Sequence, residues 1–321
     1  MLKIKISKIF NYIKAKNIIF PLIYSYRLFI LFIASFFTNY IIVKIFNFKI
    51  KLFIKDKGIS KSLYLFRERE LEHKYILSNK INKKFDYIIY DIGSNIGYYT
   101  MIFSKLVSKN SKIIAIEPVK NNFSLLNENL QINGVKNVST YNFAVSNNNE
   151  FKSIFLSKAS NLNTFHNYGS ILKQLDGLTE DVELKNIDAI NNLTNLIPNF
   201  IRMDVEGHEV EILSSILNFI VKESKYPKIL FETHLSRYNE NHNLKDIFKK
   251  FYDLGYIASM IGTSSENGIN FLQNKGYKMI KTIYSDGYKR GIFTDIDILT
   301  LDTMVHDKGG IRAILLEKYE L

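Results

Sequence analysis

The sequence predicts an α/β fold built on a doubly wound, mostly parallel sheet of about seven strands, a Rossmann-like arrangement. Short apolar runs rich in β-branched residues alternate with helical patterns from residue 87 onward, which is typical of a parallel sheet with helices on both faces. No repeat, low-complexity tract or Pro/Gly-rich linker interrupts the chain after residue 60. Acidic residues follow four of the apolar runs, where such sheets bind ligands. We therefore expect a single α/β domain over residues 61–321.

The expected elements follow this alternation in order. Strands are predicted at residues 87–90, 112–116, 138–145, 200–203, 228–231, 256–260 and 311–317, with a hairpin-like stretch around residues 151–156. Helices are predicted over residues 96–107, 121–132, 210–221 and 244–254. Most of these helices lie between two strands, as a crossover connection between parallel strands requires.

Basic charge is concentrated at the N-terminus. The 321 residues carry a net charge of +12, and within residues 1–60 basic residues outnumber acidic ones by eleven to one, Asp56 being the single acid. The rest of the chain is therefore nearly neutral, which counts against a large phosphate-binding surface, and no nucleic-acid partner is expected. The sequence holds no Cys, which excludes a disulfide scaffold, a thiolate zinc site and a Cys nucleophile.

Residues 18–43 form the most apolar part of the chain. On a helical wheel one half is wholly apolar, whereas Arg27 lies on the other half with several small polar residues and further apolar ones. Three interpretations stay open: an interfacial helix whose lysine-rich flanks meet anionic lipid, one or two helices packed on the body as a cap, and a single membrane span with a snorkelling Arg27. We expect residues 1–60 to be a basic, apolar helical extension, and the protein to be cytoplasmic or to contact the cytoplasmic face of a membrane peripherally through this extension.

Acidic side chains at the ends of the first two predicted strands indicate a ligand site. Asp91 opens a loop, Asp-Ile-Gly-Ser-Asn-Ile-Gly, that joins the first strand to its helix, and Glu117 ends the second strand. Glycines in such a loop let the backbone approach a ligand closely. Asp91 can accept hydrogen bonds from an ammonium group, and Glu117 can accept them from both hydroxyls of a ribose. The alternative is an ordinary strand-to-helix turn with a surface acid.

The spacing of the glycines favours one cofactor over another. A nicotinamide-dependent dehydrogenase would use G-x-G-x-x-G to pack a pyrophosphate on a helix N-terminus. Here the spacing is Gly-x-x-x-Gly, and the loop is preceded by Asp91. A carboxylate at that place would repel a pyrophosphate but suits the amino group of S-adenosylmethionine. The loop therefore favours methyl transfer over hydride transfer.

Six segments of the chain carry a family resemblance. They are FRERELEHKYIL (66–77), YDIGSNIGYYT (90–100), AIEPVKNNFSLLNENLQING (115–134), FAVS (143–146), IRMDVEGHEVEIL (201–213) and ILFETH (229–234). In this order they resemble the class I S-adenosylmethionine-dependent methyltransferases, and more narrowly the FkbM family, over about residues 64–260. Residues 261–305 lie outside the resemblance, and we expect them to form an insertion.

The resemblance implies an S-adenosylmethionine-dependent methyltransferase that methylates a hydroxyl group of a sugar, a glycan or a secondary metabolite, so that the partner is a small-molecule or glycan acceptor. It implies that the loop holds the cofactor, that Glu117 holds its ribose, and that its adenine lies near Phe143 and Ala144. The full set of implied cofactor-binding residues is Asp91, Gly93, Ser94, Asn95, Gly97, Tyr98, Glu117, Pro118, Phe143 and Ala144.

A hydroxyl acceptor is a poor nucleophile until a general base draws off its proton. The candidate catalytic residues, all at strand ends, are Asp204, Glu206, His208 and His234, with Glu232 close by. In this fold class Asp204 would lie beside the methyl-bearing end of the cofactor, and the two histidines can hold a neutral base near physiological pH. Alternatively, Glu206 only favours a helix N-terminus and His234 only bonds the backbone. No ligand spacing demands a divalent ion, so no metal is expected.

Two other function classes compete with this hypothesis. A catalytically silent relative would bind cofactor or glycan as a membrane-associated assembly module, and the intact acids at positions 91, 117 and 204 disfavour it. A nucleic-acid methyltransferase would carry an Asn/Asp-Pro-Pro-aromatic loop after the strand at residues 200–203, where Asp-Val-Glu-Gly stands instead.

Overall fold

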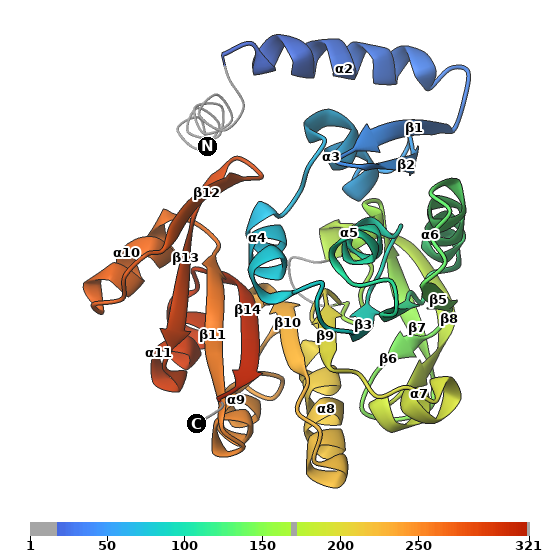
Figure 1. The fold of residues 1–321 in the computed structure, drawn as a ribbon. Coiled ribbons are helices and arrows are strands. Elements are labelled where there is room, and N and C mark those ends of the chain that lie inside the picture. The colour runs from blue at the N-terminus through green and yellow to red at the C-terminus, as the bar shows by residue number, and fades with distance from the viewer. Residues whose placement is uncertain (1–17, 168–171, 320–321) are drawn as a thin grey trace.

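A mixed sheet of nine strands forms the centre of the protein (Figure 1), which we describe from a computed structural model for residues 18–167 and 172–319. The strand order is β12-β13-β11-β14-β10-β9-β3-β4-β5. The strands are β3 (Ile88–Ile92), β4 (Lys112–Ile116), β5 (Val138–Tyr141), β9 (Phe200–Met203), β10 (Lys228–Glu232), β11 (Tyr256–Thr263), β12 (Lys281–Ser285), β13 (Tyr288–Ile296) and β14 (Ile311–Lys318).

The sheet has a parallel half and an antiparallel half. The neighbouring strands β10, β9, β3, β4 and β5 run parallel, whereas β14, β11, β13 and β12 pair antiparallel. The predicted α/β class with a parallel core is confirmed. The strand number is nine rather than about seven because residues 281–296 add β12 and β13 to one edge. The expected insertion at 261–305 is therefore an extension of the central sheet.

Helices cover both faces of the sheet. On one face lie α4 (Leu71–Lys80), α5 (Tyr98–Leu106) and α6 (Lys120–Ile132); the core on the other face takes in α7 (Ile187–Thr194), α8 (Glu209–Glu223), α9 (Lys245–Asp253), α10 (Glu266–Asn274) and α11 (Ile298–Thr303). Successive residues of β3 divide between these cores, Ile89 packing in the first and Tyr90 in the second. Because both faces are buried, the central parallel strands β3, β4, β9 and β10 are mostly apolar.

A small second sheet borders the carboxyl edge of the parallel strands. It contains β6 (Ala144–Val145), β8 (Leu175–Lys185) and β7 (Phe151–Ser157), in that order, and the short 3₁₀ helix η1 (Ser160–Leu162) follows β7. The strand expected over residues 138–145 is thus divided: β5 joins the central sheet and β6 pairs with β8. Two further short turns, η3 (Leu235–Arg237) and the π-helical η4 (Met304–Lys308), complete the described elements.

The N-terminal extension differs from the expected helical one. It consists of α2 (Phe20–Ala34), a hairpin of β1 (Tyr40–Ile45) and β2 (Phe48–Phe53), and α3 (Ile59–Phe66). Residues 1–17 of the expected extension lie outside the described residues. In the rest, residues 20–34 are helical as expected, whereas residues 40–53 alternate between buried apolar and more exposed side chains at the period of a strand. In the described part of the chain no helix combines the length and the apolarity needed to cross a bilayer.

One buried amide attaches the hairpin to the body. Asn129 of α6 is fully buried; its Oδ1 accepts a hydrogen bond from Lys51 N (2.6 Å), and its Nδ2 donates to Lys51 O (3.3 Å) and Ile96 O (2.8 Å). Asn133, one turn later and half-buried, repeats the pattern with Lys49 N (2.8 Å) and Lys49 O (2.7 Å). The helix therefore supplies β2 with the partners that another strand would otherwise provide.

We expect Asn129→Ala to lower the free energy of unfolding by about 3 kcal/mol, because it leaves buried backbone groups of Lys51 and Ile96 without partners. Asn133→Ala should cost about 1 kcal/mol, since water can replace its bonds. Urea unfolding of both variants measures the difference. Equal losses would show that the hairpin is held by apolar packing alone.

Candidate active site

A cavity opens where β3, β4 and β9 end, and several predicted site residues line it. These residues are Gly93, Asn95, Glu117, Pro118, Ala144, Asp204, Glu206 and His208. A second cavity adjoins it and shares Gly93, Asn95, Asn161 and Asp204; Ser94, Tyr98, Arg69 and Glu70 also line that second cavity. Gly97 and Phe143 line neither of the two. Asp204 therefore stands where the two cavities meet.

The glycine loop is shaped by close contacts that exclude side chains. Gly93 has φ +73°, and a Cβ there would lie 2.2 Å from the carbonyl oxygen of Asp204. Gly97 has φ +88°, and a Cβ there would lie 2.8 Å from Leu126 Cδ1 in α6. Both glycines are thus needed for the conformation and for the space. The loop runs between the end of β9 and α6, which leaves its backbone exposed to the cavities.

Asp91 supports this loop from beneath rather than from the cavity wall. Its side chain is fully buried, Thr100 Oγ1 donates to Oδ2 (2.6 Å), and Arg202 Nη1 lies 3.4 Å from Oδ1. Burial raises its pKa, which Arg202 and Thr100 oppose. Asp91 does not line either cavity. The direct bond from Asp91 to a cofactor ammonium therefore stays a prediction, whereas the ion pair between Asp91 and Arg202 is present in the structure.

Glu117 presents a buried carboxylate to the first cavity. Its Oε2 accepts from Asn95 N (2.9 Å), and its Oε1 accepts from Val119 N (3.0 Å) and from Asn122 Nδ2 (3.3 Å). Burial raises its pKa to about 7, even though these three bonds favour the charged form. Such a carboxylate has room for further donors, as two ribose hydroxyls would be.

Two polar atoms in the cavity walls lack a hydrogen-bond partner in the part of the chain that the structure describes. Ser160 Oγ and Asn161 Oδ1 are buried, without a hydrogen-bond partner among the described residues, and both residues line the first cavity. They come from η1, which Asn95 Nδ2 ties to the glycine loop through Ser160 O (3.1 Å). Buried polar atoms are normally paired, so these two indicate a polar ligand between η1 and the loop.

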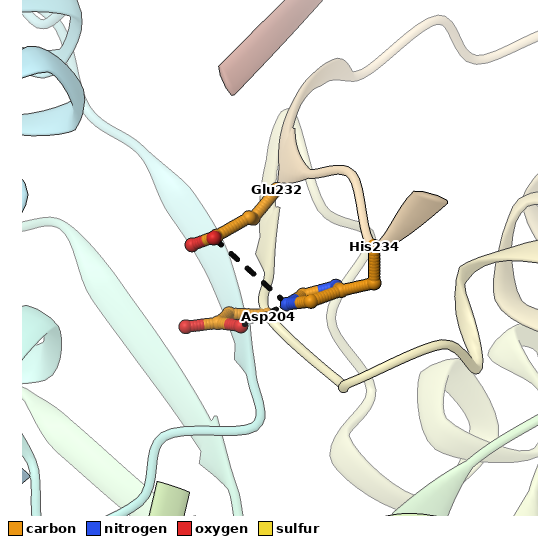
Figure 2. Close-up of side chains that lie close together, drawn as sticks. All are labelled: Asp204, Glu232 and His234. Atoms are coloured by element: carbon orange, nitrogen blue, oxygen red, sulfur yellow. Dashed lines mark ion pairs between the residues drawn. The ribbon is translucent and has the colours of Figure 1, made fainter. Parts of the chain in front are cut away.

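The second part of the site is a histidine surrounded by carboxylates. His234 Nε2 lies 3.7 Å from Asp204 Oδ1, 3.6 Å from Glu206 Oε1 and 3.9 Å from Glu232 Oε1. Its Nδ1 donates to Glu209 Oε1 at 2.8 Å. Figure 2 shows Asp204, Glu232 and His234 converging from the ends of neighbouring strands. Candidate ligand atoms of these three lie within 4.8 Å of one another, so this is also where a metal ion could be held.

The charge on His234 differs from the expected one. Burial alone would lower its pKa, but Glu206, Glu209 and Glu232 together raise the pKa well above its usual value. His234 is therefore an imidazolium near neutral pH, rather than the neutral base expected from the sequence. It is a cation among four carboxylates.

Arginines hold the carboxylates from the other side. Arg202 Nη2 lies 3.1 Å from Asp204 Oδ2, and Arg312 Nη2 lies 3.1 Å from Glu232 Oε1. Sequence reasoning missed both. A signal existed, since each arginine interrupts an apolar strand that is buried on both faces, where a charge must find a partner. Glu209, at the start of α8, is fully buried, and Tyr238 OH donates to its second oxygen at 3.0 Å.

His208 lies apart from this cluster, on the side of the small sheet. Its Nε2 is 3.0 Å from Ser146 Oγ and its Nδ1 is 3.3 Å from Glu211 Oε2. Burial lowers its pKa to about 4, so His208 is neutral. Its ring packs on Phe165 at 4.7 Å between centroids. The structure thus separates the two histidines that the sequence grouped together.

Glu206 stands on a strained turn between β9 and α8. It has φ +49°, and Gly207 next to it has φ +107°, where a Cβ would lie 2.6 Å from Arg237 Cβ. Left-handed backbone at a residue other than glycine costs about 1 kcal/mol and often marks a functional site. Here it turns Glu206 toward His234, while Arg237 Nη2 lies 3.3 Å from its other oxygen.

Comparison with known proteins identifies the family. The model of the methyltransferase FkbM domain matches residues 91–258, from the first strand acid to β11. The chain belongs to the FkbM methyltransferase family. The family resemblance read from the sequence is confirmed.

Solved structures with a similar fold are distant from this FkbM-domain chain. The methyltransferase FkbM from Methylobacillus flagellatus is 16% identical, with 73% of this chain and 52% of that chain covered and a TM-score of 0.36, so this chain spans about half its length. TYW2 from M. jannaschii, solved in complex with AdoMet, is 15% identical, with 88% of each chain covered and a TM-score of 0.42. Precorrin-6y C5,15-methyltransferase from Geobacter metallireducens is 13% identical, with 78% and 88% covered and a TM-score of 0.38. No curated protein matches the chain.

Family membership implies S-adenosylmethionine-dependent methyl transfer, and the residues present fit that cofactor. Glu117 offers a buried acceptor for ribose hydroxyls, and Ser160 and Asn161 offer unpaired polar atoms in the same walls. Gly93 lets the backbone come close without a side chain in the way. Among the described residues no arginine or lysine lines the first cavity, which disfavours a pyrophosphate there.

We expect Glu117→Ala to weaken S-adenosylhomocysteine binding about 10- to 100-fold, because two charge-assisted hydrogen bonds are lost. Calorimetric titration measures it. Glu128→Ala, which removes a more exposed carboxylate of α6, is the matched control and should leave the affinity unchanged. Unchanged binding in Glu117→Ala would remove this residue from the cofactor site.

Binding should also depend on pH through Glu117. Ligand hydroxyls that donate to the carboxylate lower its pKa, so the complex binds fewer protons than the free protein, whose Glu117 pKa is about 7. Affinity should therefore rise as the pH increases toward about 7 and level off above it. Calorimetry from acidic to mildly alkaline pH tests this, and Glu117→Ala should lack the rise. An affinity that falls over the same range would contradict the assignment.

We expect the cluster in Figure 2 to need no metal ion, because a protonated His234 already supplies the positive charge and cannot act as a ligand. Arg202 and Arg312 neutralise Asp204 and Glu232 as well. Chelator treatment, or added Mg²⁺, Mn²⁺ or Zn²⁺, should thus leave the melting temperature unchanged. A rise with one of these ions that Asp204→Asn abolishes would show a metal site instead.

Proposed function

We propose that this methyltransferase acts on a hydroxyl group of a sugar, a glycan or a similarly hydroxylated metabolite. The observation that carries the proposal is the position of Asp204, a carboxylate at the junction of the two cavities that is held between Arg202 and His234. Methyl transfer to oxygen needs such a proton acceptor, since a neutral hydroxyl is a weak nucleophile.

The cofactor, when bound, supplies an electrophilic methyl group on a sulfonium sulfur. The chain's own part is to position it and to exclude water. Glu117 would hold the ribose side, and the backbone of the glycine loop with Asn161 would line its path toward Asp204. The second cavity, with Arg69 and Glu70 in its wall, offers both charges that an amino-acid tail requires.

Asp204 is the residue we assign to accept the acceptor's proton. Its Oδ2 is bound to Arg202, whereas its Oδ1 faces His234 without a hydrogen bond at 3.7 Å. His234 and Arg202 hold the Asp204 carboxylate from two sides, so its position in the site is fixed. Glu209 fixes the orientation of His234 through Nδ1.

The polarity of the surroundings supports a sugar-like acceptor. The groups near Asp204 are ionisable: His234 and Arg312 are partly exposed, and Glu232 is buried. Carboxylates and guanidinium groups bond hydroxyls well and offer little to a flat apolar acceptor. We place the reaction in the cytoplasm, as the sequence led us to expect.

A catalytically silent, cofactor-binding relative is the second candidate. Its one supporting feature is that every carboxylate of the cluster already has a cationic partner, which is how a purely structural network would look. The two functions differ in one measurable way, since only the enzyme releases S-adenosylhomocysteine when an acceptor is present.

We expect Asp204→Asn to lower kcat by about 100- to 10,000-fold while the affinity for S-adenosylhomocysteine changes less than about threefold, because only the proton acceptor is lost. The assay follows labelled methyl transfer to a panel of free sugars, nucleotide sugars and glycan fractions. Asp188→Asn, a surface carboxylate of α7 paired with Lys222, is the control.

Thermal unfolding of Asp204→Asn shows whether the fold survives the loss of the Arg202 ion pair. Full activity of a folded Asp204→Asn variant would refute the assignment. Cofactor binding by the native protein without transfer to any acceptor of the panel would favour the silent relative.

A further inference from the structure

One face of α2 is apolar and uncovered by the described residues. Its large side chains point outward, Phe29 and Phe32 being 61% and 60% exposed, and the apolar surface continues past the helix to Phe37, which is 84% exposed. We call this surface the outer face. The residues that form it are Leu22, Ile23, Tyr26, Phe29, Phe32, Ile33, Phe36 and Phe37.

The opposite face of α2 packs on the body. Phe20 is buried against Phe66 of α3 at 5.9 Å between ring centroids, and Leu31 is buried in the core shared with the hairpin. Arg27, the single charged residue of the helix, turns inward and donates to Leu65 O. The interpretation of this segment as a cap packed on the body thus fits the inner face of α2. Most of the apolar half of the helical wheel faces away from the body.

This arrangement is unusual for a protein surface. Exposed apolar residues are normally scattered, whereas a continuous apolar patch marks an interaction surface. At the outer end of the molecule in Figure 1, α2 lies across α3 and the β1–β2 hairpin. Its 15 residues span about 22 Å, so it suits a position in the plane of an interface.

The charge near the outer face favours one of two partners, a second copy of the chain or a lipid surface. The hairpin region and α3, on which α2 packs, carry exposed lysines at positions 44, 49, 55, 57 and 61, and five more lysines precede α2 in the sequence. A second copy of the chain would bring the same positive charge against this one. An anionic lipid surface offers both the apolar interior that the outer face needs and the negative charge that the lysines need.

We infer that α2 is a membrane-docking helix that lies in the plane of an anionic lipid surface with its outer face in the lipid. The inner face, with Arg27, keeps the helix attached to α3 and the hairpin. The inference does not depend on methyl transfer, because it concerns a surface on another part of the molecule.

Flotation of the full-length protein with vesicles tests it. The protein should float with vesicles of phosphatidylcholine mixed with phosphatidylserine, more weakly with phosphatidylcholine alone, and less at high salt. The double variant Phe29→Ser/Phe32→Ser should partition at least tenfold less. The control pair Phe85→Ser/Phe151→Ser removes two equally exposed phenylalanines elsewhere, 64% and 77% exposed, and should float as the native protein does.

Three results would overturn the inference. The native protein fails to float; the Phe29→Ser/Phe32→Ser variant floats as well as the native protein; or sedimentation without lipid shows a stable dimer that the same variant dissociates. The last result would assign the outer face to a second copy. Because all four residues are exposed, circular dichroism should confirm that each variant folds, and none of these measurements requires an active enzyme.

Discussion

The buried guanidinium of Arg202 is the interaction on which the site depends. Parallel strands bring their carboxyl ends to one edge, and here that edge collects Asp91, Asp204 and Glu232 within or close to a nearly dry interior. Carboxylates so placed repel one another unless a cation lies between them. Arg202 lies between Asp91 and Asp204, with its guanidinium 4.2 Å from the centre of the Tyr99 ring. Through these two ion pairs Arg202 links Asp91, which supports the glycine loop, to Asp204, the proposed proton acceptor.

The antiparallel strand β14 supplies a second cation that neutralises carboxylates at this edge of the sheet. It lies next to β10 and places Arg312 between Glu232, Glu70 and Glu72, so an acid of the parallel half is neutralised by a base of the antiparallel half. His234 then supplies the remaining positive charge. This explains why a histidine at a strand end, which the sequence presents as a base, becomes a fixed cation once its neighbours are known. Its role is set by charge balance rather than by its ordinary pKa.

The sequence predicts the fold well for strands that are buried on both faces of the sheet, and much less well for the other segments. Residues 112–116 and 200–203 were assigned to strands with the observed bounds because an apolar run buried on both faces can hardly end elsewhere. The hairpin at residues 40–53 was missed because its apolar residues also fit one side of a helical wheel. The positions of Ser160 and Asn161 had no signal at all, since η1 reaches the cavity only through the small sheet. Sequence also cannot tell whether a strand-end acid such as Asp91 faces the cavity or the interior.

The FkbM-domain match covers one part of the site and leaves another part outside it, and this bears on which acceptor the enzyme chooses. The residues proposed for the cofactor, from Asp91 to Asn161, fall inside the segment that matches the FkbM domain. Several groups on the side of the second cavity and of Glu232 fall outside it: Arg69 and Glu70 precede the match, and Arg312 follows it. Segments outside a shared domain can differ between relatives while the cofactor chemistry stays the same. The choice of acceptor should therefore be sought beside Glu232, where β14 places Arg312. α3 leads from the second cavity, at Ile59, to the contact with α2 at Phe66, so one short helix connects that side of the site to the docking helix.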